Sequence, residues 1–209
     1  MKVLVVGANG NTGRRIIRLL ALGPHDPVAM IRQPAQRPTF DSLGVPTVLA
    51  DLEYPIDHAV AGCEAVVFAA GSGSLTGKDK TVLVDQLGAI RTIVTAGVHG
   101  ARRFLMLSAL NADVNSTSKI SHYHKAKGHA DKHLCQSDLD YTIICPGRLT
   151  DETGTRRVAV SREIYGKGQT SRDNLAAALV VCLDLNHTVR RSFSLVDGDT
   201  PLDEALRSL

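Results

Sequence analysis

Three glycines spaced three residues apart are the feature of this chain that most directly suggests chemistry. Gly7, Gly10 and Gly13 lie between an apolar run, residues 2–6, and an amphipathic segment, residues 12–22. Glycines at a strand-to-helix turn allow a sharp bend and a close approach of the backbone to a diphosphate, and the first N–H groups of the helix face the anion. Glycines also cluster in ordinary tight turns, but the flanking strand and helix favour a nucleotide-binding turn.

The residue that follows the next apolar run indicates which nucleotide is bound. In many dinucleotide-binding folds an acidic residue about twenty positions beyond the glycines holds the ribose hydroxyls of NAD. Here Arg32 stands at that place, at the end of a predicted strand over residues 27–31. Since a guanidinium matches a 2′-phosphate in charge and bidentate geometry, the sequence predicts NADP(H) as cofactor, with NAD less favoured. An exposed surface arginine is the alternative.

Two later strand ends carry residues suited to the rest of the nucleotide. Asp51 and Leu52 follow a third predicted strand, where the aspartate could accept from the adenine amino group while the leucine packs on the ring. A turn-forming aspartate is the alternative for Asp51. Ala69, Ala70 and Gly71 follow the fourth apolar run, and their small side chains would let a ribose pass close to the backbone.

A serine, a tyrosine and a lysine are the candidate catalytic residues. Ser108 ends the fifth predicted strand, and Tyr123 and Lys127 follow at helical i and i+4 positions. They would share one helix face, so that the lysine lowers the pKa of the phenol and reaches a nicotinamide ribose hydroxyl. Tyr123 would then donate a proton while Ser108 orients a substrate carbonyl. Taken alone, the Tyr–Lys spacing also fits an amphipathic helix with an interfacial tyrosine.

Short β-branched runs alternate with longer amphipathic segments, which is the pattern of a parallel sheet covered by helices. Strands are predicted at residues 2–6, 27–31, 45–49, 65–70, 103–108, 140–144 and 192–196. Helices are predicted at residues 12–22, 56–61, 79–98, 121–137, 172–184 and 202–207. The sequence therefore predicts an α/β fold, a doubly wound parallel sheet of about seven strands with ligands at the carboxyl ends of the strands.

The domain organisation is expected to be simple. The 209 residues suffice for one substantial core and are few for two, so we expect a single domain over residues 1–209. A small substrate-side region is expected from about residues 145–170 and the C-terminus. Within it, residues 150–168 lack a clear period and could form a loop that covers a substrate.

With these motifs in place, the chain resembles the small atypical short-chain dehydrogenases/reductases, and in particular the YhfK-like bacterial group. More distantly it is similar to the flavin/biliverdin reductases and to NmrA-like proteins. The stretches that carry the resemblance include residues 7–13, 67–73, 76–81, 103–108, 139–143 and 198–201, Tyr123 with Lys127, and Pro146 with Gly147. The resemblance implies a Rossmann domain that binds an NADP-type cofactor. It implies cofactor contacts along the turn, at Gly7, Gly10, Asn11, Thr12 and Gly13, and a nicotinamide edge near Pro146 and Gly147. Asn9, in the same turn, is a further cofactor-binding candidate.

One position departs from the family pattern. Cys145 stands where the family usually has an arginine before Pro-Gly. Any anion contact made by that arginine is therefore lost or moved to Arg148. A buried, unreactive thiol is the simplest interpretation of Cys145.

Composition excludes several other classes of protein. A formal net charge of +3, with arginine pairs at 102/103, 156/157 and 190/191 that we interpret as solvated surface, gives no nucleic-acid footprint. No apolar stretch approaches the ~18 residues of a membrane span, so we expect a cytoplasmic protein with no membrane partner. The four cysteines form no CxxC pair, and His129 and His133 have helical metal-ligand spacing without a third ligand, so no metal is predicted.

Together these features predict an NADPH-dependent reductase that transfers a hydride to a small carbonyl, quinone, flavin or similar acceptor. Two alternatives stay open: a catalytically silent NADP(H)-sensing protein of the NmrA-like kind and, with less support, a sugar epimerase or dehydratase. The expected partner is a small-molecule substrate, and the expected assembly is a monomer or homodimer.

Overall fold

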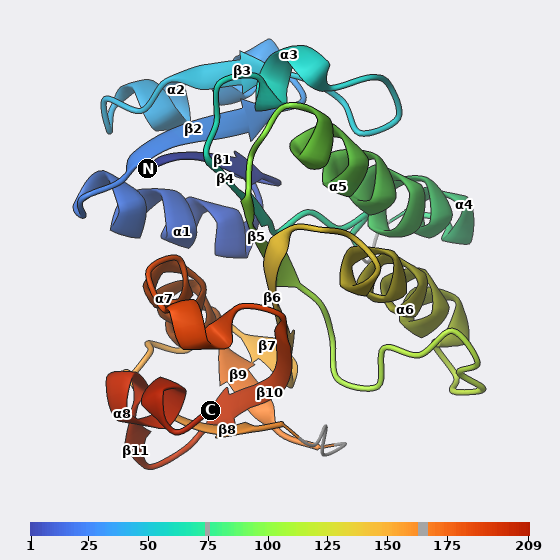
Figure 1. Cartoon of the computed structure of the whole chain (residues 1–209), viewed down its shortest axis with the longest axis vertical. Helices are drawn as coiled ribbons and strands as arrows, with labels where there is room; N and C mark the ends of the chain where they lie inside the picture. The colour runs from blue at the N-terminus through green and yellow to red at the C-terminus, as the bar shows by residue number, and fades with distance from the viewer. Residues whose placement is uncertain (74–75, 163–166) are drawn as a thin grey trace.

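A twisted sheet of nine strands runs through the molecule, with helices on both faces (Figure 1). The computed structural model describes residues 1–73, 76–162 and 167–209. The strand order is β11-β8-β10-β6-β5-β4-β1-β2-β3, and a separate two-stranded sheet pairs β7 with β9. The strands are β1 (Lys2–Val6), β2 (Asp26–Ile31), β3 (Thr47–Leu49), β4 (Ala65–Phe68), β5 (Arg103–Leu107), β6 (Asp140–Pro146), β7 (Arg148–Thr150), β8 (Arg157–Ser161), β9 (Gln169–Ser171), β10 (Arg191–Asp197) and β11 (Thr200–Pro201).

The predicted doubly wound parallel sheet is confirmed. Within the large sheet, the neighbouring strands β3, β2, β1, β4, β5, β6 and β10 are all parallel, as in the register Val3↔Ala65 between β1 and β4. All seven predicted strands are present, with ends shifted by a few residues.

The sequence did not predict four short strands, β7, β8, β9 and β11. Two of them, β8 and β11, extend the sheet in antiparallel fashion beyond β10. They are half-exposed and gain their partners from distant parts of the chain, as in the pair Val158↔Asp197, so local periodicity carries little signal for them.

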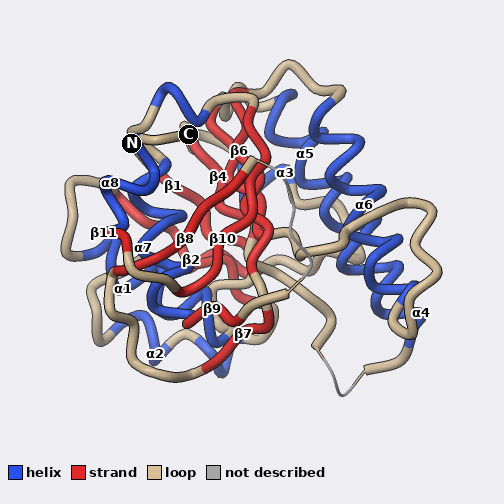
Figure 2. The backbone as a smooth tube through the Cα atoms, turned by 90° about the horizontal axis from the view of Figure 1, so that it is seen from below, coloured by secondary structure: helices blue, strands red, loops and turns tan. Residues whose placement is uncertain are grey.

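The helices divide between the two faces of the sheet (Figures 1 and 2). One face carries α1, α7 and α8, and the other carries the segment from α4 to α5 together with α6. The helical segments are α1 (Asn11–Ala21), η1 (Pro34–Gln36), α2 (Pro38–Asp41), α3 (Asp57–Val60), α4 (Lys78–Lys80), η2 (Thr81–Gly88), α5 (Ala89–Val98), α6 (Ser121–Cys135), α7 (Arg172–Cys182), η3 (Asn186–Thr188) and α8 (Leu202–Arg207).

Each face of the sheet has its own apolar core. Along β1, Val3 and Val5 pack with α1 and α7, whereas Leu4 and Val6 pack on the opposite side with α5. Strands buried on both faces need continuous apolar runs, which is why the central strands were the easiest elements to predict.

The segment Lys78–Val98 is one long helical stretch whose middle part, η2, is π-helical. By length and composition it could cross a membrane, with 50% of its most apolar window buried inside the protein. The expectation that no stretch approaches such a length was therefore wrong on this criterion. A buried core helix passes the same test, so the finding carries no further conclusion.

Arg103 is a second correction, because it is buried rather than solvated. Its guanidinium donates to the carbonyl oxygens of Asp140 and Cys182, each at 2.5 Å, and to the hydroxyl of Thr142 at 2.7 Å. These bonds join β5, β6 and α7. The other two arginine pairs are exposed, as expected.

The region expected to form a loop over a substrate, residues 150–168, begins at the last residue of β7 and contains β8 in its middle. Residues 163–166 of that predicted loop lie outside the described residues. Whether the region covers a substrate stays a prediction.

Candidate functional site

The glycine turn joins the end of β1 to the start of α1. Gly7 has a φ of +82°, and a Cβ on it would lie 2.6 Å from the backbone nitrogen of Ala70. A Cβ on Gly13 would lie 2.1 Å from the carbonyl oxygen of Gly7. These two glycines therefore let the turn pack against the end of β4 and against itself.

Gly10 faces outward and precedes the first turn of α1. Helix α1 has no side-chain cap at Gly10 and no acidic residue in its first turn. Gly10, Asn11 and Thr12 line a large cavity. The first N–H groups of a helix have no intrahelical partner, so this end of α1 fits an anionic group such as a diphosphate.

That cavity has a volume of about 1110 Å³ and lies at the carboxyl ends of β1, β4, β5 and β6. Its size and position are those of a ligand site in a doubly wound fold. It is lined by eleven of the predicted site residues: Gly10, Asn11, Thr12, Ala69, Ala70, Gly71, Ser108, Tyr123, Lys127, Pro146 and Gly147. The structure therefore brings the predicted cofactor turn and the predicted catalytic residues to one cavity.

The other predicted cofactor residues do not line this cavity. Gly7 and Gly13 are packing positions within the turn, as described above. The side-chain oxygen of Asn9 accepts from the Arg14 guanidinium, with the Nη2 atom at 2.6 Å, so Asn9 shapes the outside of the turn.

Arg32, Asp51 and Leu52 lie beyond the glycine turn, after β2 and β3. Arg32 is exposed directly after β2. Asp51 accepts from the backbone N–H of Glu53 at 3.0 Å, which is the turn role given as its alternative, and Leu52 is buried in the core. Contacts of these three with a nucleotide stay predictions.

Lys127 is buried at the end of the cavity that holds the candidate catalytic residues. Its ammonium donates to the carbonyl oxygen of Leu107 at 3.0 Å and lies 3.6 Å from a carboxyl oxygen of Asp85. Burial by itself lowers the pKa of Lys127, but Tyr123, Asp85 and Asp131 together outweigh burial, and the pKa is raised. Lys127 therefore keeps its charge in a site that is almost closed to water.

Asp85 comes from the π-helical segment η2 and is also buried. Its second carboxyl oxygen accepts from the backbone N–H of Ser72 at 2.9 Å. Asp85 thus ties the chain that follows β4 to Lys127 on α6. π-Helical turns often occur at functional sites, where they re-aim a side chain.

Ser108 does not present a free hydroxyl to the cavity. Its Oγ donates a short hydrogen bond to Oδ2 of Asp131 on α6. Burial raises the pKa of Asp131 to about 6, against the hydrogen bond from Ser108 and the charge of Lys127, which lower it. The other carboxyl oxygen of Asp131 is buried and has no hydrogen-bond partner among the described residues.

Tyr123 lies beside Lys127, whose ammonium is 6.0 Å from the centre of the phenol ring. Burial raises the pKa of Tyr123, Lys127 lowers it, and the carboxylates of Asp85 and Asp131 raise it again. The net direction is upward, so the expectation of a lowered phenol pKa was wrong, although the contribution of Lys127 has the expected sign.

Cys145 is the buried thiol that the sequence suggested. It is 1% exposed, and burial raises its pKa to about 12. A thiol with so high a pKa is a poor nucleophile. Among the described residues no group of three or more His, Cys, Asp or Glu side chains is arranged to hold a metal ion.

Sequence reasoning assigned no role to Asp85 or Asp131. A signal for Asp131 was present, because Tyr123, Lys127 and Asp131 follow one another at i, i+4 and i+8 on one helix face. Asp85 had no local signal, since its contact with Lys127 spans two elements far apart in the chain.

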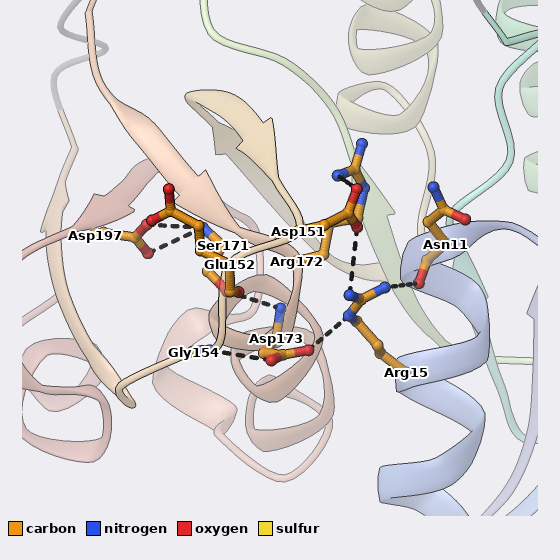
Figure 3. Close-up of polar contacts among 9 residues, drawn as sticks. All are labelled: Asn11, Arg15, Asp151, Glu152, Gly154, Ser171, Arg172, Asp173 and Asp197. Atoms are coloured by element: carbon orange, nitrogen blue, oxygen red, sulfur yellow. Dashed lines mark hydrogen bonds and ion pairs between the residues drawn. The ribbon is translucent and has the colours of Figure 1, made fainter.

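A network of charged side chains holds the first turn of α1 against the C-terminal part of the chain (Figure 3). Arg15 pairs with Asp173 on α7 at 2.6 Å and with one oxygen of Asp151 at 3.3 Å. The second oxygen of Asp151 pairs with Arg172 at 3.0 Å, and Arg172 lines the cavity. We call Arg15, Asp151, Arg172 and Asp173 the α1–α7 clasp.

Comparison with known proteins agrees with this geometry. The sequence model of a family described as NAD(P)H-binding matches residues 7–186. The YhfK protein of Bacillus subtilis (strain 168), described as an uncharacterized sugar epimerase, is 43% identical over 215 residues, which cover 100% of both chains. The resemblance to the YhfK-like group is therefore confirmed.

Solved structures give the same result. A protein of Bacillus halodurans, provisionally described as an NAD-dependent epimerase/dehydratase, is 41% identical, with a TM-score of 0.95 and 100% of both chains covered. The oxidoreductase ylbE from Lactococcus lactis is 25% identical with a TM-score of 0.86, covering 100% of this chain and 96% of that one. The likeness extends over the whole chain and includes the glycine turn.

Proposed function

Because the chain belongs to the NAD(P)H-binding family, we propose that it is an NADPH-dependent reductase of the short-chain dehydrogenase/reductase superfamily. The acceptor would be a small carbonyl, quinone, flavin or similar molecule. The observation that supports this proposal is one cavity with two different ends. At one end lies the uncapped start of α1, where an anion can bind, and at the other lies the buried pair of Lys127 and Asp85. A reduced nicotinamide nucleotide bound there would supply the hydride.

The residues of this chain would divide the remaining tasks. Gly10, Asn11 and Thr12 would hold the diphosphate at the start of α1. Lys127 would supply a fixed positive charge, and the hydroxyl groups of Ser108 and Tyr123 would face the acceptor. Lys127 is 3% exposed, so its ammonium is shielded from bulk water.

The preference for NADPH over NADH would come from Arg32. This side chain is exposed next to the glycine turn, at the end of β2, where the adenosine ribose lies in related folds. A charge-assisted hydrogen bond to the 2′-phosphate contributes about 1.5–3 kcal/mol, or about 10- to 100-fold in affinity.

Titration of the purified protein with NADPH and NADH tests the cofactor proposal. We expect NADPH to bind more tightly and Arg32→Glu to remove about 10- to 100-fold of that preference. Arg191→Glu, an identical charge change at the exposed amino end of β10, is the control and should leave the preference intact. Absence of binding by either nucleotide would overturn the proposal.

The acceptor is then sought by following NADPH oxidation with a panel of quinones, flavins and aldehydes. Net consumption of NADPH with one of them is the result expected of a reductase.

A sugar epimerase is the second candidate, because two relatives above 40% identity carry that or an epimerase/dehydratase description. An epimerase returns its hydride to the substrate, so it would interconvert a nucleotide sugar without net consumption of the cofactor. That outcome in the same assays would replace the reductase proposal.

A further inference from the structure

Ser108 lies between the cavity and a buried carboxyl group. It lines the cavity, while Asp131, to which it donates, is not among the described residues that do so. A serine hydroxyl carries one hydrogen. While that hydrogen is donated to Asp131, Ser108 cannot donate to a ligand in the cavity.

The charges around Ser108 do not balance when both carboxyl groups are ionised. Lys127 is the cation of the cluster, and its ammonium lies 3.6 Å from Asp85. The other oxygen of Asp85 accepts from the backbone N–H of Ser72 at 2.9 Å, so Asp85 lies against both an ammonium group and a backbone donor. Oδ1 of Asp85 and Oδ1 of Asp131 are both buried without a hydrogen-bond partner among the described residues. Oδ1 of Asp85 lies 3.6 Å from the Lys127 ammonium, whereas Asp131 forms no ion pair in the part of the chain that the structure describes. Such a carboxyl group favours the protonated form.

We propose that Asp131 and Ser108 form a proton relay into the cavity, in which protonated Asp131 donates to Ser108 and the freed Ser108 hydroxyl protonates the acceptor. The inference rests on the proposed reductase function. The acceptor gains a hydride from the reduced nicotinamide and a proton from Oγ of Ser108. Ser108 regains a proton from Oδ2 of Asp131, and the carboxylate that remains is reprotonated from water. Asp131 acts through Ser108 and is a positioning residue.

The surroundings of Asp131 suit this exchange. The groups that face it are Ser108 directly after β5, Lys127 and Tyr123 from its own helix, and Cys145 from β6. Asp85 from η2 lies on Lys127 and interacts with the same lysine and tyrosine. Burial raises its pKa to about 6, close to neutrality, where a general acid is most effective.

Tyr123 is less suited to give up its proton. The net upward direction of its pKa means that the phenolate left behind is disfavoured. Its hydroxyl can still orient the acceptor as a hydrogen-bond donor.

Single-turnover hydride transfer, measured against pH with NADPH already bound, tests the relay. In the wild type we expect the rate to fall as pH rises through the pKa of Asp131. Asp131→Asn should lower the rate by about 10²–10⁴-fold and abolish this pH dependence, because an amide has no acidic proton to pass on. Asp131→Glu should restore a pH dependence, and Tyr123→Phe should retain it.

The control is Asp138→Asn, the same chemical change in the exposed turn after α6, which should behave as the wild type. The relay is overturned if Asp131→Asn keeps the wild-type pH profile, or if Tyr123→Phe is the variant that loses it.

A second measurement needs no turnover. In protein labelled with ¹³C-aspartate, the carboxyl resonance that disappears in Asp131→Asn should titrate near 6. Ser108→Ala should raise that midpoint, because the serine hydrogen bond stabilises the carboxylate. A midpoint in the ordinary aspartate range, about 3.9, or one insensitive to Ser108→Ala, contradicts the relay. Failure to bind NADPH contradicts the proposed function instead, so the two failures are distinguishable.

Discussion

The two ends of the cavity are built in opposite ways. At the glycine turn the backbone makes the site, through residues that have no side chain and a helix start without a side-chain cap. At the other end side chains make the site: Lys127, Asp85 and Ser108 are buried and Asp131 is half-buried. They come from α6, from η2 and from the residue directly after β5. One end offers neutral N–H groups to an anion, and the other holds fixed charges away from water.

The difference indicates which substitutions would disrupt each end of the cavity. The backbone end tolerates no added volume at Gly7 or Gly13, because atoms already lie where a Cβ would stand. The side-chain end tolerates small changes of shape but no unbalanced charge, because an unpaired buried ion is costly. Added volume at the backbone end and removed charge at the side-chain end test this contrast.

The largest effect is expected at the backbone end. Gly13→Ala would place a methyl group 2.1 Å from the carbonyl oxygen of Gly7, which is backbone and cannot rotate away. We expect a loss of more than about 4 kcal/mol in the free energy of unfolding and loss of NADPH binding. Urea denaturation and nucleotide titration measure both.

Gly97→Ala is the matched control, since Gly97 is also helical but a Cβ there meets nothing within 4 Å. It should stabilise the protein by up to about 1 kcal/mol. Equal effects of the two substitutions would mean that close packing does not define the turn.

At the side-chain end, Lys127→Met leaves Asp85 buried without its cation. The expected loss is about 3–5 kcal/mol in the free energy of unfolding. Adding Asp85→Asn to Lys127→Met should recover part of that loss without restoring turnover, because the charge imbalance is removed but the site is not rebuilt. A double-mutant cycle measures the coupling.

Lys132→Met, an exposed lysine on the same helix, should change the free energy of unfolding by less than about 0.5 kcal/mol. If the losses from Lys127→Met and Asp85→Asn simply add, the buried ion pair does not account for the stability of this end.

The carboxyl group of Asp131 predicts a pH dependence of stability. Folding raises its pKa from 3.8 to about 6, so the native state binds this proton more tightly than the unfolded chain. Its stabilising contribution is complete below pH ~3.9 and is lost as pH rises through about 6, on the order of 3 kcal/mol in all. Asp131→Asn should lack this component when denaturation is repeated across the pH range. An unchanged pH profile would contradict burial of the carboxyl group.

The smallest effect is expected at the α1–α7 clasp, where the charges are partly exposed. The side chains of Arg15 and Asp173 are 27% and 41% exposed. Arg15→Ala should therefore cost no more than about 1 kcal/mol in the free energy of unfolding, and less in high salt. A loss as large as that of Lys127→Met would show that the clasp, rather than the two ends of the cavity, holds the site together.

Most of the fold was predictable because the central strands are buried on both faces. Apolar runs such as residues 2–6 leave few alternatives, and the predicted terminal helix matches α8, Leu202–Arg207. Strands β8 and β11 were not predicted, because the strands that they pair with are distant in sequence or too short to give a local pattern. Arg103 was misplaced because an arginine pair looks the same whether one guanidinium meets water or meets carbonyl oxygens of β6 and α7.

The sequence by itself determined the nucleotide turn, because Gly7, Gly10 and Gly13 act through local backbone conformation and need only the neighbouring strand and helix. It also placed Tyr123 and Lys127 on one helix face. Only the tertiary structure decided how that face works. It brought Asp85 to Lys127 and Asp131 to Ser108, and it reversed the expected direction of the Tyr123 pKa. Electrostatic effects depend on burial and on distances across elements, and neither is encoded in the spacing of residues along the chain.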